Sequence, residues 1–303
     1  MKINPSRTTL RELLEKGPVF APCVYDCTSA KVVEMCGFKA MCLSGGEVSQ
    51  SLVGMPDLGL VTQDELVSVV NHICDMSPLP MIVDIDTGFG NELNVMRTCE
   101  RVAKAGGMAV HLEDQTFPKR CGHLTGKQVI PTEEYLAKVR AAHHVLKDTD
   151  CLLIARTDSY NLNGKEDAID RCTRALDCGA DVTLAEGIDS YEAIEEIGRR
   201  VPGWKMFGMS SAGASPKVTF DQLVNWGFNL VTMHFTMRGA LTGMLEFGKK
   251  TYETMSDVYA CEHVTVPNGV LGIYELYGIH DWLKMAASFG GDVKDCSAYK
   301  PKD

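Results

Sequence analysis

The amino-acid sequence repeats one alternation along most of its 303 residues, and this alternation restricts the fold more than any other feature. Short apolar runs rich in β-branched residues end in glycine or polar residues, and helical periodicity follows most of them. Strands and helices in such alternation form a parallel sheet with helices on its outer side. The strand candidates lie at residues 19–26, 40–45, 81–88, 108–114, 151–158, 182–187, 205–209 and 230–235.

Helix candidates lie between these runs, at residues 28–36, 63–75, 93–104, 131–144, 166–178, 190–200 and 220–225. Thr132 is placed to cap the fourth of them, and Gly37, Gly106, Gly179 and Gly227 stand where a helix C-cap glycine precedes a strand. Eight such units predict a closed (β/α)8 barrel of the TIM type, in one domain over residues 1–303. A doubly wound open sheet is the alternative, disfavoured by the count of eight and by the lack of a GxGxxG motif after the first strand.

Charge and composition exclude several classes of partner. The net charge of −10 argues against nucleic acid or an anionic membrane surface as the main partner. No apolar run reaches the roughly 20 residues of a membrane span, and the first residues lack the apolar region of a secretory signal. The 12 cysteines lie mostly within apolar runs, without a CxxC pair or zinc-ligand spacing. We therefore expect a reduced, cytoplasmic protein.

Polar residues gather where the strand candidates end. In a (β/α)8 barrel the carboxyl ends of the strands build the active site. Buried strands rarely tolerate charge without a partner, so a ring of such residues predicts a site, although one or two of them could be helix caps. The ring comprises Asp26, Ser44, Gly45, Gly46, Asp84, Asp86, Glu113, Arg156, Asp158, Glu186, Ser210 and His234.

Three carboxylates in this ring suit a metal ion. Asp84 and Asp86 are two residues apart and therefore share one face of a strand, and Glu113 ends the next strand. Oxygen ligands without histidine or cysteine favour a hard cation, Mg²⁺ first and Mn²⁺ as a substitute. Such an ion would polarise a carbonyl group or stabilise an enolate. The alternative for Asp86 is a helix cap or an ordinary loop acid.

Two further features of the ring could bind an anion. The backbone N–H groups of Ser44-Gly45-Gly46 could cradle a carboxylate, although glycines after a strand are often only turns. Arg156 could hold a carboxylate bidentately, or it could form a buried ion pair with one of the ring acids. His111, within a strand candidate, is interpreted as a satisfied core histidine.

The polar connection at about 115–131 carries the run Lys119-Arg120-Cys121-Gly122-His123. A thiol flanked by cations should have a lowered pKa, and Gly122 lets the backbone pass close to a ligand. A loop of this length and content is typical of a lid over a site, the alternative being a basic surface loop with an incidental cysteine. Together with a metal and an anion cradle, the lid predicts chemistry on a small 2-oxo or 2-hydroxy acid, with Cys121 giving or taking a proton at carbon.

These motifs resemble the isocitrate lyase/phosphoenolpyruvate mutase superfamily, in family order over roughly residues 15–245. The KRCGH run at 119–123 resembles the lyase branch, which includes 2-methylisocitrate lyase, 2,3-dimethylmalate lyase and oxaloacetate hydrolase. Phosphonate-forming mutases lack the lid cysteine. The other matching segments are Leu43-Ser44-Gly45-Gly46, Gly54-Met55-Pro56-Asp57-Leu58-Gly59, Asp84-Ile85-Asp86-Thr87-Gly88-Phe89-Gly90, Glu113-Asp114-Gln115, Ala155-Arg156-Thr157-Asp158 and Glu186-Gly187.

The resemblance implies a Mg²⁺-dependent barrel that binds a small carboxylate substrate. It also implies a homotetramer, a dimer of dimers, with a C-terminal helical extension at about 245–303 exchanged between subunits. The implied metal shell is Asp84, Asp86 and Glu113. The implied substrate-binding residues are Ser44, Gly45, Gly46, Asp57, Asp86, Gly122, His123, Arg156, Ser210 and His234. The implied catalytic residues are Lys119, Cys121, His123, Arg156 and Glu186.

The implied reaction is a retro-aldol-like cleavage, in which a 2-hydroxy acid loses its hydroxyl proton, C2–C3 breaks, and Cys121 protonates the carbanion. Cys42 replaces the tyrosine of methylisocitrate lyases, and Gly208 replaces an asparagine that grips distal carboxylates, so we expect a substituted malate rather than a tricarboxylate. Ala185-Glu186-Gly187 leans toward the dimethylmalate lyase and oxaloacetate hydrolase branch. The alternative is an oxaloacetate hydrolase, disfavoured because His234 replaces a serine there. A carboxylate-binding barrel without catalysis is a remote alternative.

Overall fold

The computed structural model describes residues 7–267 and 270–291, and the chain divides into two compact units, Met1–Met237 and Arg238–Asp303. In the first unit eight parallel strands close into a barrel in which each strand pairs with the next and β8 pairs with β1. All eight strand candidates and the predicted (β/α)8 barrel are thereby confirmed. The strands are β1 (Val19–Val24), β2 (Met41–Leu43), β3 (Met81–Asp84), β4 (Ala109–Glu113), β5 (Leu152–Thr157), β6 (Val182–Ala185), β7 (Trp204–Met209) and β8 (Leu230–Met233).

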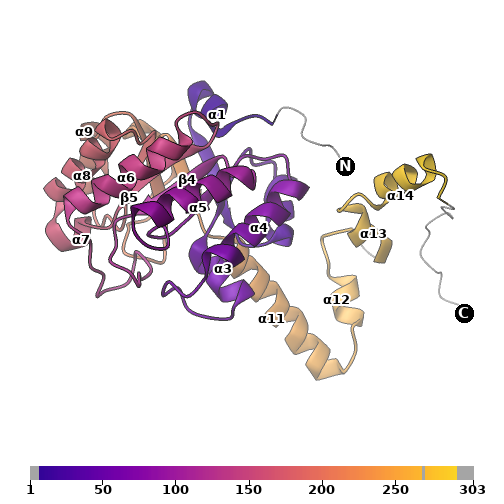
Figure 1. Ribbon diagram of the computed structural model, residues 1–303. Coiled ribbons are helices and arrows are strands. Elements are labelled where there is room, and N and C mark those ends of the chain that lie inside the picture. The colour runs from indigo at the N-terminus through magenta and orange to yellow at the C-terminus, as the bar shows by residue number, and fades with distance from the viewer. Residues whose placement is uncertain (1–6, 268–269, 292–303) are drawn as a thin grey trace, which may run out of the picture. The chain divides into compact units, whose positions relative to one another are not determined.

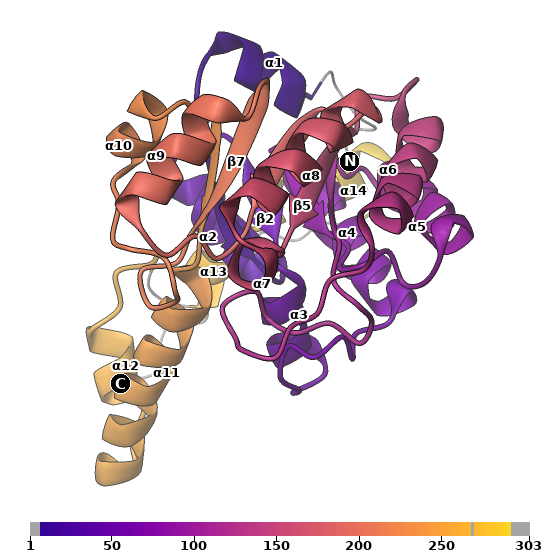
Figure 2. The ribbon, with the colours of Figure 1, turned by 90° about the vertical axis from the view of Figure 1, so that its left-hand side faces the viewer.

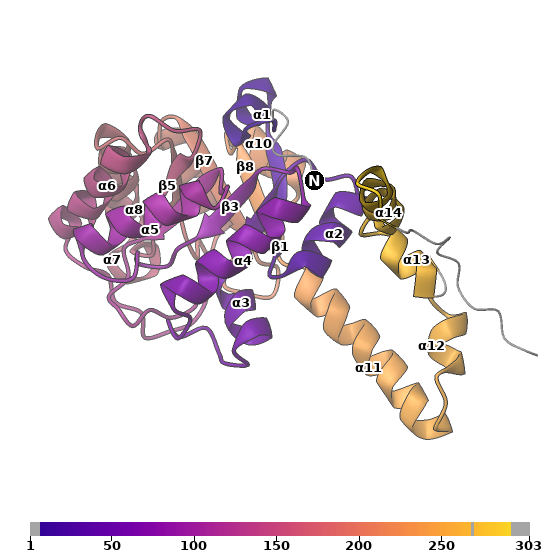
Figure 3. The ribbon, with the colours of Figure 1, turned by 45° about the vertical axis from the view of Figure 1, so that its right-hand side comes forward.

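Helices surround this barrel (Figure 1). Helices α6, α8 and α9 lie outside the strands in Figure 2, and α4 and α5 lie side by side on the outer side of β3 in Figure 3. The helices are α1 (Leu10–Lys16), α2 (Cys27–Met35), α3 (Gly45–Leu52), α4 (Gln63–Met76), α5 (Glu92–Lys104), α6 (Thr132–Leu146), α7 (Tyr160–Asn163), α8 (Lys165–Asp177), α9 (Tyr191–Arg200) and α10 (Phe220–Asn225).

The seven helix candidates are confirmed within a few residues, and α1, α3 and α7 were not predicted. The Thr132 cap was wrong, because Pro131 occupies the N-cap position and Thr132 is the first helical residue. The four glycines do follow helix ends, each with a positive φ between 84° and 100°. A positive φ ends a helix without strain only where the residue has no Cβ.

The inside of the barrel is filled by small and branched side chains that alternate along the strands. Cys23 of β1, Cys42 of β2, Ile82 of β3 and Ala109 of β4 belong to one buried cluster with residues of the other strands. Leu10 and Leu14 of α1 belong to the same cluster, so this helix closes one end of the barrel. The other two buried clusters lie between the strands and the outer helices.

The second compact unit is helical. Helix α11 (Thr236–Thr254) begins at the last residues of the first unit and continues into the second unit, which starts at Arg238. Helices α12 (Val258–Glu262), α13 (Val270–Glu275) and α14 (Ile279–Ser288) follow. Residues 268–269 and 292–303 of the expected extension lie outside the described residues. None of the helices described in either unit is both long and apolar enough to cross a membrane.

Candidate active site

The predicted ring of polar residues lies at one end of the barrel because of the period of two along each strand. Ala109, His111 and Glu113 share a face of β4, and Ile154 and Arg156 share a face of β5. Ala109 and Ile154 lie in the barrel core, so Glu113 and Arg156 point inward where their strands end. Asp26 differs from the rest of the ring, because its carboxylate accepts from Ser29 N (2.7 Å) and caps α2.

The three carboxylates predicted to bind metal end the neighbouring strands β3 and β4. Asp86 and Glu113 are buried, and Asp84 is largely so. Among the described residues Asp86 Oδ1 is paired with Lys119 and Glu113 Oε2 with Arg156, whereas Glu113 Oε1 has no polar partner. Burial raises the pKa of Asp86 to about 6 and raises that of Glu113 well above its usual range. A bound cation would give Glu113 Oε1 a partner and favour the ionised form of both acids.

These residues fit a divalent cation that keeps part of its water shell. Among the described residues no three His, Cys, Asp or Glu side chains are close enough together to coordinate a metal ion by themselves. Mg²⁺ is usually held by one or two carboxylates together with water and substrate oxygens, so it needs no such set of side chains. The buried carboxylates of Asp86 and Glu113 are suited to that mode. The Mg²⁺ or Mn²⁺ site therefore stays a prediction.

Lys119 of the lid reaches down into the acid cluster. Its Nζ lies 2.5 Å from Asp57 Oδ1 and 2.8 Å from Asp86 Oδ1, and its side chain is buried. Burial alone would lower the pKa of Lys119, but the charges of Asp86, Glu113, Asp84 and Asp57 outweigh it and raise that pKa. The structure thus brings Lys119 and Asp57 together as a cross-link between the lid and the loop after α3.

The run Ser44-Gly45-Gly46 is the start of α3, so the predicted cradle is a helix N-terminus. Ser44 Oγ accepts from Glu47 N (3.3 Å), and Gly45 N donates to Asp84 Oδ2 (3.4 Å). A Cβ on Gly45 would lie 3.1 Å from Asp86 Oδ1, and one on Gly46 would lie 3.1 Å from Asp57 Oδ2. A side chain at either position would push the neighbouring acid by a few tenths of an ångström, so glycine suits this close approach.

The lid connects β4 to α6 and is braced at its base. Gln115 pairs with Val129 in an antiparallel bridge, and its side chain exchanges hydrogen bonds with the backbone of Arg120. On the outer side of the barrel Asp114 accepts from Thr157 Oγ1 (2.6 Å) and from Arg171 Nη1 (3.1 Å). Arg171 Nη1 also donates to Ile130 O (3.0 Å), so one guanidinium holds both ends of the lid.

The tip of the lid lies against the strand ends of β5 and β6. Lys127 Nζ lies 3.0 Å from Asp158 Oδ1 and also donates to Gly122 O. His123 Nε2 lies 3.1 Å from Glu186 Oε1, and its Nδ1 accepts from Ala214 N (3.2 Å) in the loop after β7. Burial would raise the pKa of Glu186, but Arg156 and His123 outweigh it and lower that pKa. A Cβ on Gly122 would lie 2.6 Å from Glu186 Cγ, and one on Gly213 would lie 2.5 Å from His123 Nδ1 and 2.9 Å from Ser210 Oγ, so the predicted residues Gly122, His123, Glu186 and Ser210 are brought together.

Cys121 does not have the lowered pKa expected from its flanking cations. Burial raises the pKa of this thiol, and that effect outweighs the opposing influence of the His123 backbone, Arg156 and Lys119. The expectation was wrong because Lys119 turns away into the acid cluster, where its charge is shared with Asp57 and Asp86. A half-buried thiol of this kind holds its proton at neutral pH, as a proton donor must.

Arg156 forms ion pairs with two acids of the ring. Its Nε donates to Asp158 Oδ2 (2.7 Å), and its Nη1 lies 3.3 Å from Glu113 Oε2. The alternative of a buried ion pair was therefore correct, and it does not exclude substrate contact, because the guanidinium has five donors. His111 is buried, but its Nε2 has no partner among the described residues, so the expectation of a satisfied histidine was wrong.

The family model described as phosphoenolpyruvate phosphomutase matches residues 10–251. The chain belongs to the phosphoenolpyruvate mutase/isocitrate lyase superfamily. A 2-methylisocitrate lyase of Aeropyrum pernix is 37% identical over 295 residues, which cover 95% of this chain and 92% of the relative. A chloroplastic carboxyvinyl-carboxyphosphonate phosphorylmutase of Arabidopsis thaliana is 39% identical over 251 residues, 80% of this chain and 74% of the relative.

Solved structures of the superfamily share the whole architecture. A crystal structure of 2,3-dimethylmalate lyase has a TM-score of 0.89 at 32% identity and covers 96% of this chain, which spans 97% of that structure. A structure of oxaloacetate acetylhydrolase with 3,3-difluorooxalacetate has a TM-score of 0.86 at 31% identity, with 95% and 98% covered. This member of the superfamily is a lyase, as the names of its relatives indicate.

Sequence reasoning missed Lys127, Glu47 and the Asp114–Arg171 pair of this superfamily member. Lys127 and Arg171 carry no motif of their own, and only their burial, at 6% and 3% exposure, marks them. A buried cation must have a partner, but a sequence does not show which cations are buried.

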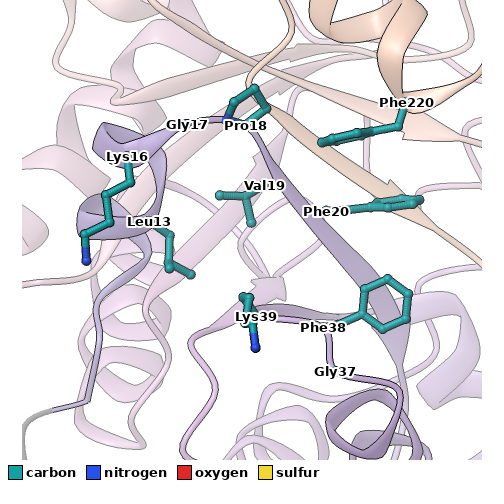
Figure 4. Close-up of a pocket in the computed structure, with 10 residues that line it drawn as sticks. All are labelled: Leu13, Lys16, Gly17, Pro18, Val19, Phe20, Gly37, Phe38, Lys39 and Phe220. Carbon is teal, nitrogen blue, oxygen red and sulfur yellow. The ribbon is translucent and has the colours of Figure 1, made fainter.

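A separate pocket of about 330 Å³ lies at the opposite end of the barrel, where β1 begins (Figure 4). Phe20, Phe38 and Phe220 line it, with the rings of Phe20 and Phe220 stacked 5.2 Å apart. In (β/α)8 enzymes chemistry occurs at the carboxyl ends of the strands. This pocket is therefore not assigned to the reaction.

Proposed function

We propose that the protein is a Mg²⁺-dependent carbon–carbon lyase that cleaves a substituted malate to a 2-oxo acid and a second carboxylic acid. The observation that carries the proposal is the position of the lid, with Lys119 among the acids and Gly122 against Arg156 and Glu186. This arrangement brings the half-buried Cys121 near Lys119, Asp57 and Arg156 at the strand ends. The names of the 2-methylisocitrate and 2,3-dimethylmalate lyases among its relatives support it.

Each part of the proposed reaction can be assigned to residues of this chain. When bound beside Asp84, Asp86 and Glu113, Mg²⁺ supplies positive charge that stabilises the oxygen anion at C2. The first N–H groups of α3 and the guanidinium of Arg156 orient the carboxylate at C1. The closed lid excludes water, which would otherwise compete for the developing carbanion at C3. Cys121 then gives its proton to that carbon.

The distal end of the site favours a small substrate. A Cβ on Gly208 would lie 3.2 Å from Glu186 Oε2, so the glycine leaves this side of the Glu186 carboxylate uncovered. Glycine has no side-chain amide with which to hold the extra carboxylate of a tricarboxylate. We therefore propose a malate with methyl-sized substituents rather than 2-methylisocitrate as the preferred substrate.

We further propose a homotetramer in the reduced cytoplasm. Large apolar side chains on the helices of the second unit are exposed, among them Met244 (62%), Leu245 (59%), Trp282 (58%) and Phe289 (85%). Exposed apolar residues in such numbers mark a surface that another chain covers. The ten cysteines between Cys23 and Cys178 are free thiols, which supports a reducing compartment.

The test is a substrate panel with the purified protein and Mg²⁺, read by NMR. It contains 2,3-dimethylmalate, citramalate, 2-methylisocitrate, isocitrate and oxaloacetate. Pyruvate from a substituted malate, with kcat/KM at least tenfold above that for 2-methylisocitrate, is the expected result. Turnover of 2-methylisocitrate alone would contradict the size argument, and inertness toward every hydroxy acid would contradict the lyase proposal.

The second candidate is an oxaloacetate hydrolase, favoured by the structural likeness to oxaloacetate acetylhydrolase. Oxalate and acetate from oxaloacetate, without pyruvate from any substituted malate, would establish this alternative. The imidazole of His234 at the end of β8 argues against it, because the serine expected there in hydrolases is absent from this position.

A further inference from the structure

A histidine and a buried glutamate form a pair on the wall of the site formed by β1, β2 and β8. His234 Nδ1 lies 3.0 Å from Oε1 of Glu47, which belongs to the first turn of α3 and is 6% exposed. The other oxygen of Glu47 lies 3.5 Å from Thr236 Oγ1, whose hydroxyl donates to Cys23 O (2.8 Å). The hydroxyl of Thr236 has a single proton, so the 3.0 Å contact with His234 is the short one that this carboxylate makes. Neither the metal shell nor the lid uses this pair.

Glu47 fixes which nitrogen of His234 carries the proton. A carboxylate accepts from Nδ1–H, so the neutral imidazole has its lone pair on Nε2. That nitrogen faces the barrel interior, where Cys23 Sγ lies 3.7 Å away, and a thiol is a weak partner that a substrate oxygen can displace. The His234 side chain is 44% exposed, in contrast to Glu47, so it can be reached from the mouth of the barrel.

The groups around the imidazole favour proton uptake. Burial would lower the pKa of His234, but the facing carboxylates Glu47 on α3, Glu186 after β6 and Asp84 on β3 outweigh it and raise that pKa. The remaining titratable neighbours are the hydrogen-bonded thiols of Cys23 on β1 and Cys42 on β2. A histidine that is held by a carboxylate and keeps a lone pair toward the site has the arrangement of a general base.

The proposed cleavage needs such a base, because the hydroxyl proton at C2 must leave before C2–C3 breaks. Cys121 is the donor on the lid and keeps its own proton for C3. We propose that His234, positioned by Glu47, is the general base that removes the proton of the C2 hydroxyl. The O–H electron pair becomes the second bond of the C2 carbonyl, and the C2–C3 pair takes the proton of Cys121. His234 and Cys121 then return to their starting forms by exchange with water.

This inference rests on the proposed lyase function, and the experiment separates the two. We would measure kcat and KM between pH 5 and 9 for wild type, His234→Gln and Glu47→Gln with the best substrate of the panel. Glu275→Gln is the matched control, because Glu275 lies 3.1 Å from His280 in an exposed pair of the same kind in the second unit. Oxalate binding by calorimetry shows whether each variant keeps a folded site.

His234→Gln should lower kcat by about 10²-fold or more, change KM little, and remove the acid limb of the pH profile. Glu47→Gln should shift that limb to lower pH, because an imidazole without its carboxylate has a lower pKa. NMR titration of the His234 Cε1–H should show the same shift, and Glu275→Gln should change neither quantity.

Two outcomes overturn the inference. An active wild type together with a His234→Gln variant that keeps kcat and only raises KM would make His234 a binding residue and leave the lyase proposal intact. A wild type without activity on any hydroxy acid would remove the proposed function and this inference with it.

Discussion

A methyl group on Gly122 would lie 2.6 Å from Cγ of Glu186, closer than any real Cβ contact. The lid reaches the far wall of the site only because this residue has no side chain. Gly122→Ala should therefore hold the lid open and lower kcat/KM by about 10²-fold, as a misplacement near 1 Å does. Steady-state kinetics would measure the loss. Gly243→Ala, which meets nothing within 4 Å, is the control and should be fully active.

Cys121→Ser should lower kcat by about 10²- to 10⁴-fold, because a hydroxyl is a far weaker acid than a thiol. The fold and the binding of oxalate should be unchanged, as judged by circular dichroism and calorimetry. Cys178→Ser, at a partly exposed thiol on the outer side of the barrel, serves as the matched control. Equal activity of Cys121→Ser and wild type would exclude the thiol as the proton donor.

Removal of metal by EDTA should abolish activity, and added Mg²⁺ should restore it. A ligand that binds only the folded state stabilises it, so Mg²⁺ should also raise the melting temperature of the EDTA-treated protein. In Asp86→Asn that thermal shift should disappear, because the proposed metal shell loses one of its negative charges. Full turnover in excess chelator would rule the metal out.

Arg171→Met should destabilise the fold by about 3 kcal/mol, because it leaves the buried Asp114 without its cation. The lid should loosen as well, since Ile130 O loses its donor. Urea denaturation measures the first effect, and limited proteolysis within 115–131 measures the second. Arg199→Met removes an exposed pair with Glu195 and should cost less than about 1 kcal/mol. Equal losses in the two variants would contradict this account of Arg171.

Stability should fall in acid through Asp158. Burial would raise the pKa of this carboxyl, but Arg156 and Lys127 lower it to about 2. The unfolded value is about 3.9, so the contribution, roughly 2 to 3 kcal/mol, is fully present above about pH 5 and is lost as the pH falls through 2. In Lys127→Met the loss should begin at higher pH, because one of the two cations is gone. Urea denaturation between pH 6 and 2 measures both; identical acid limbs would show that Lys127 does not act on Asp158.

The sequence alone determined the barrel and most of the polar residues at the carboxyl ends of its strands. Strand period and apolar content are local properties, so the eight strands of the barrel and the polar residues at their ends could be predicted. Asp84, Asp86, Glu113 and Arg156 could be assigned to one rim because a parallel barrel brings all strand ends together. Their hydrogen-bond partners could not be assigned in this way.

Only the tertiary structure decided which groups are buried and paired. Lys119 lies near Cys121 in sequence, yet its charge is directed to Asp57 and Asp86, and burial then raises the pKa of the thiol. Glu47 and His234 are 187 positions apart, and no local pattern joins them. The pKa of a group depends on its burial and on charges within a few ångströms, and those distances are set by the packing of distant segments.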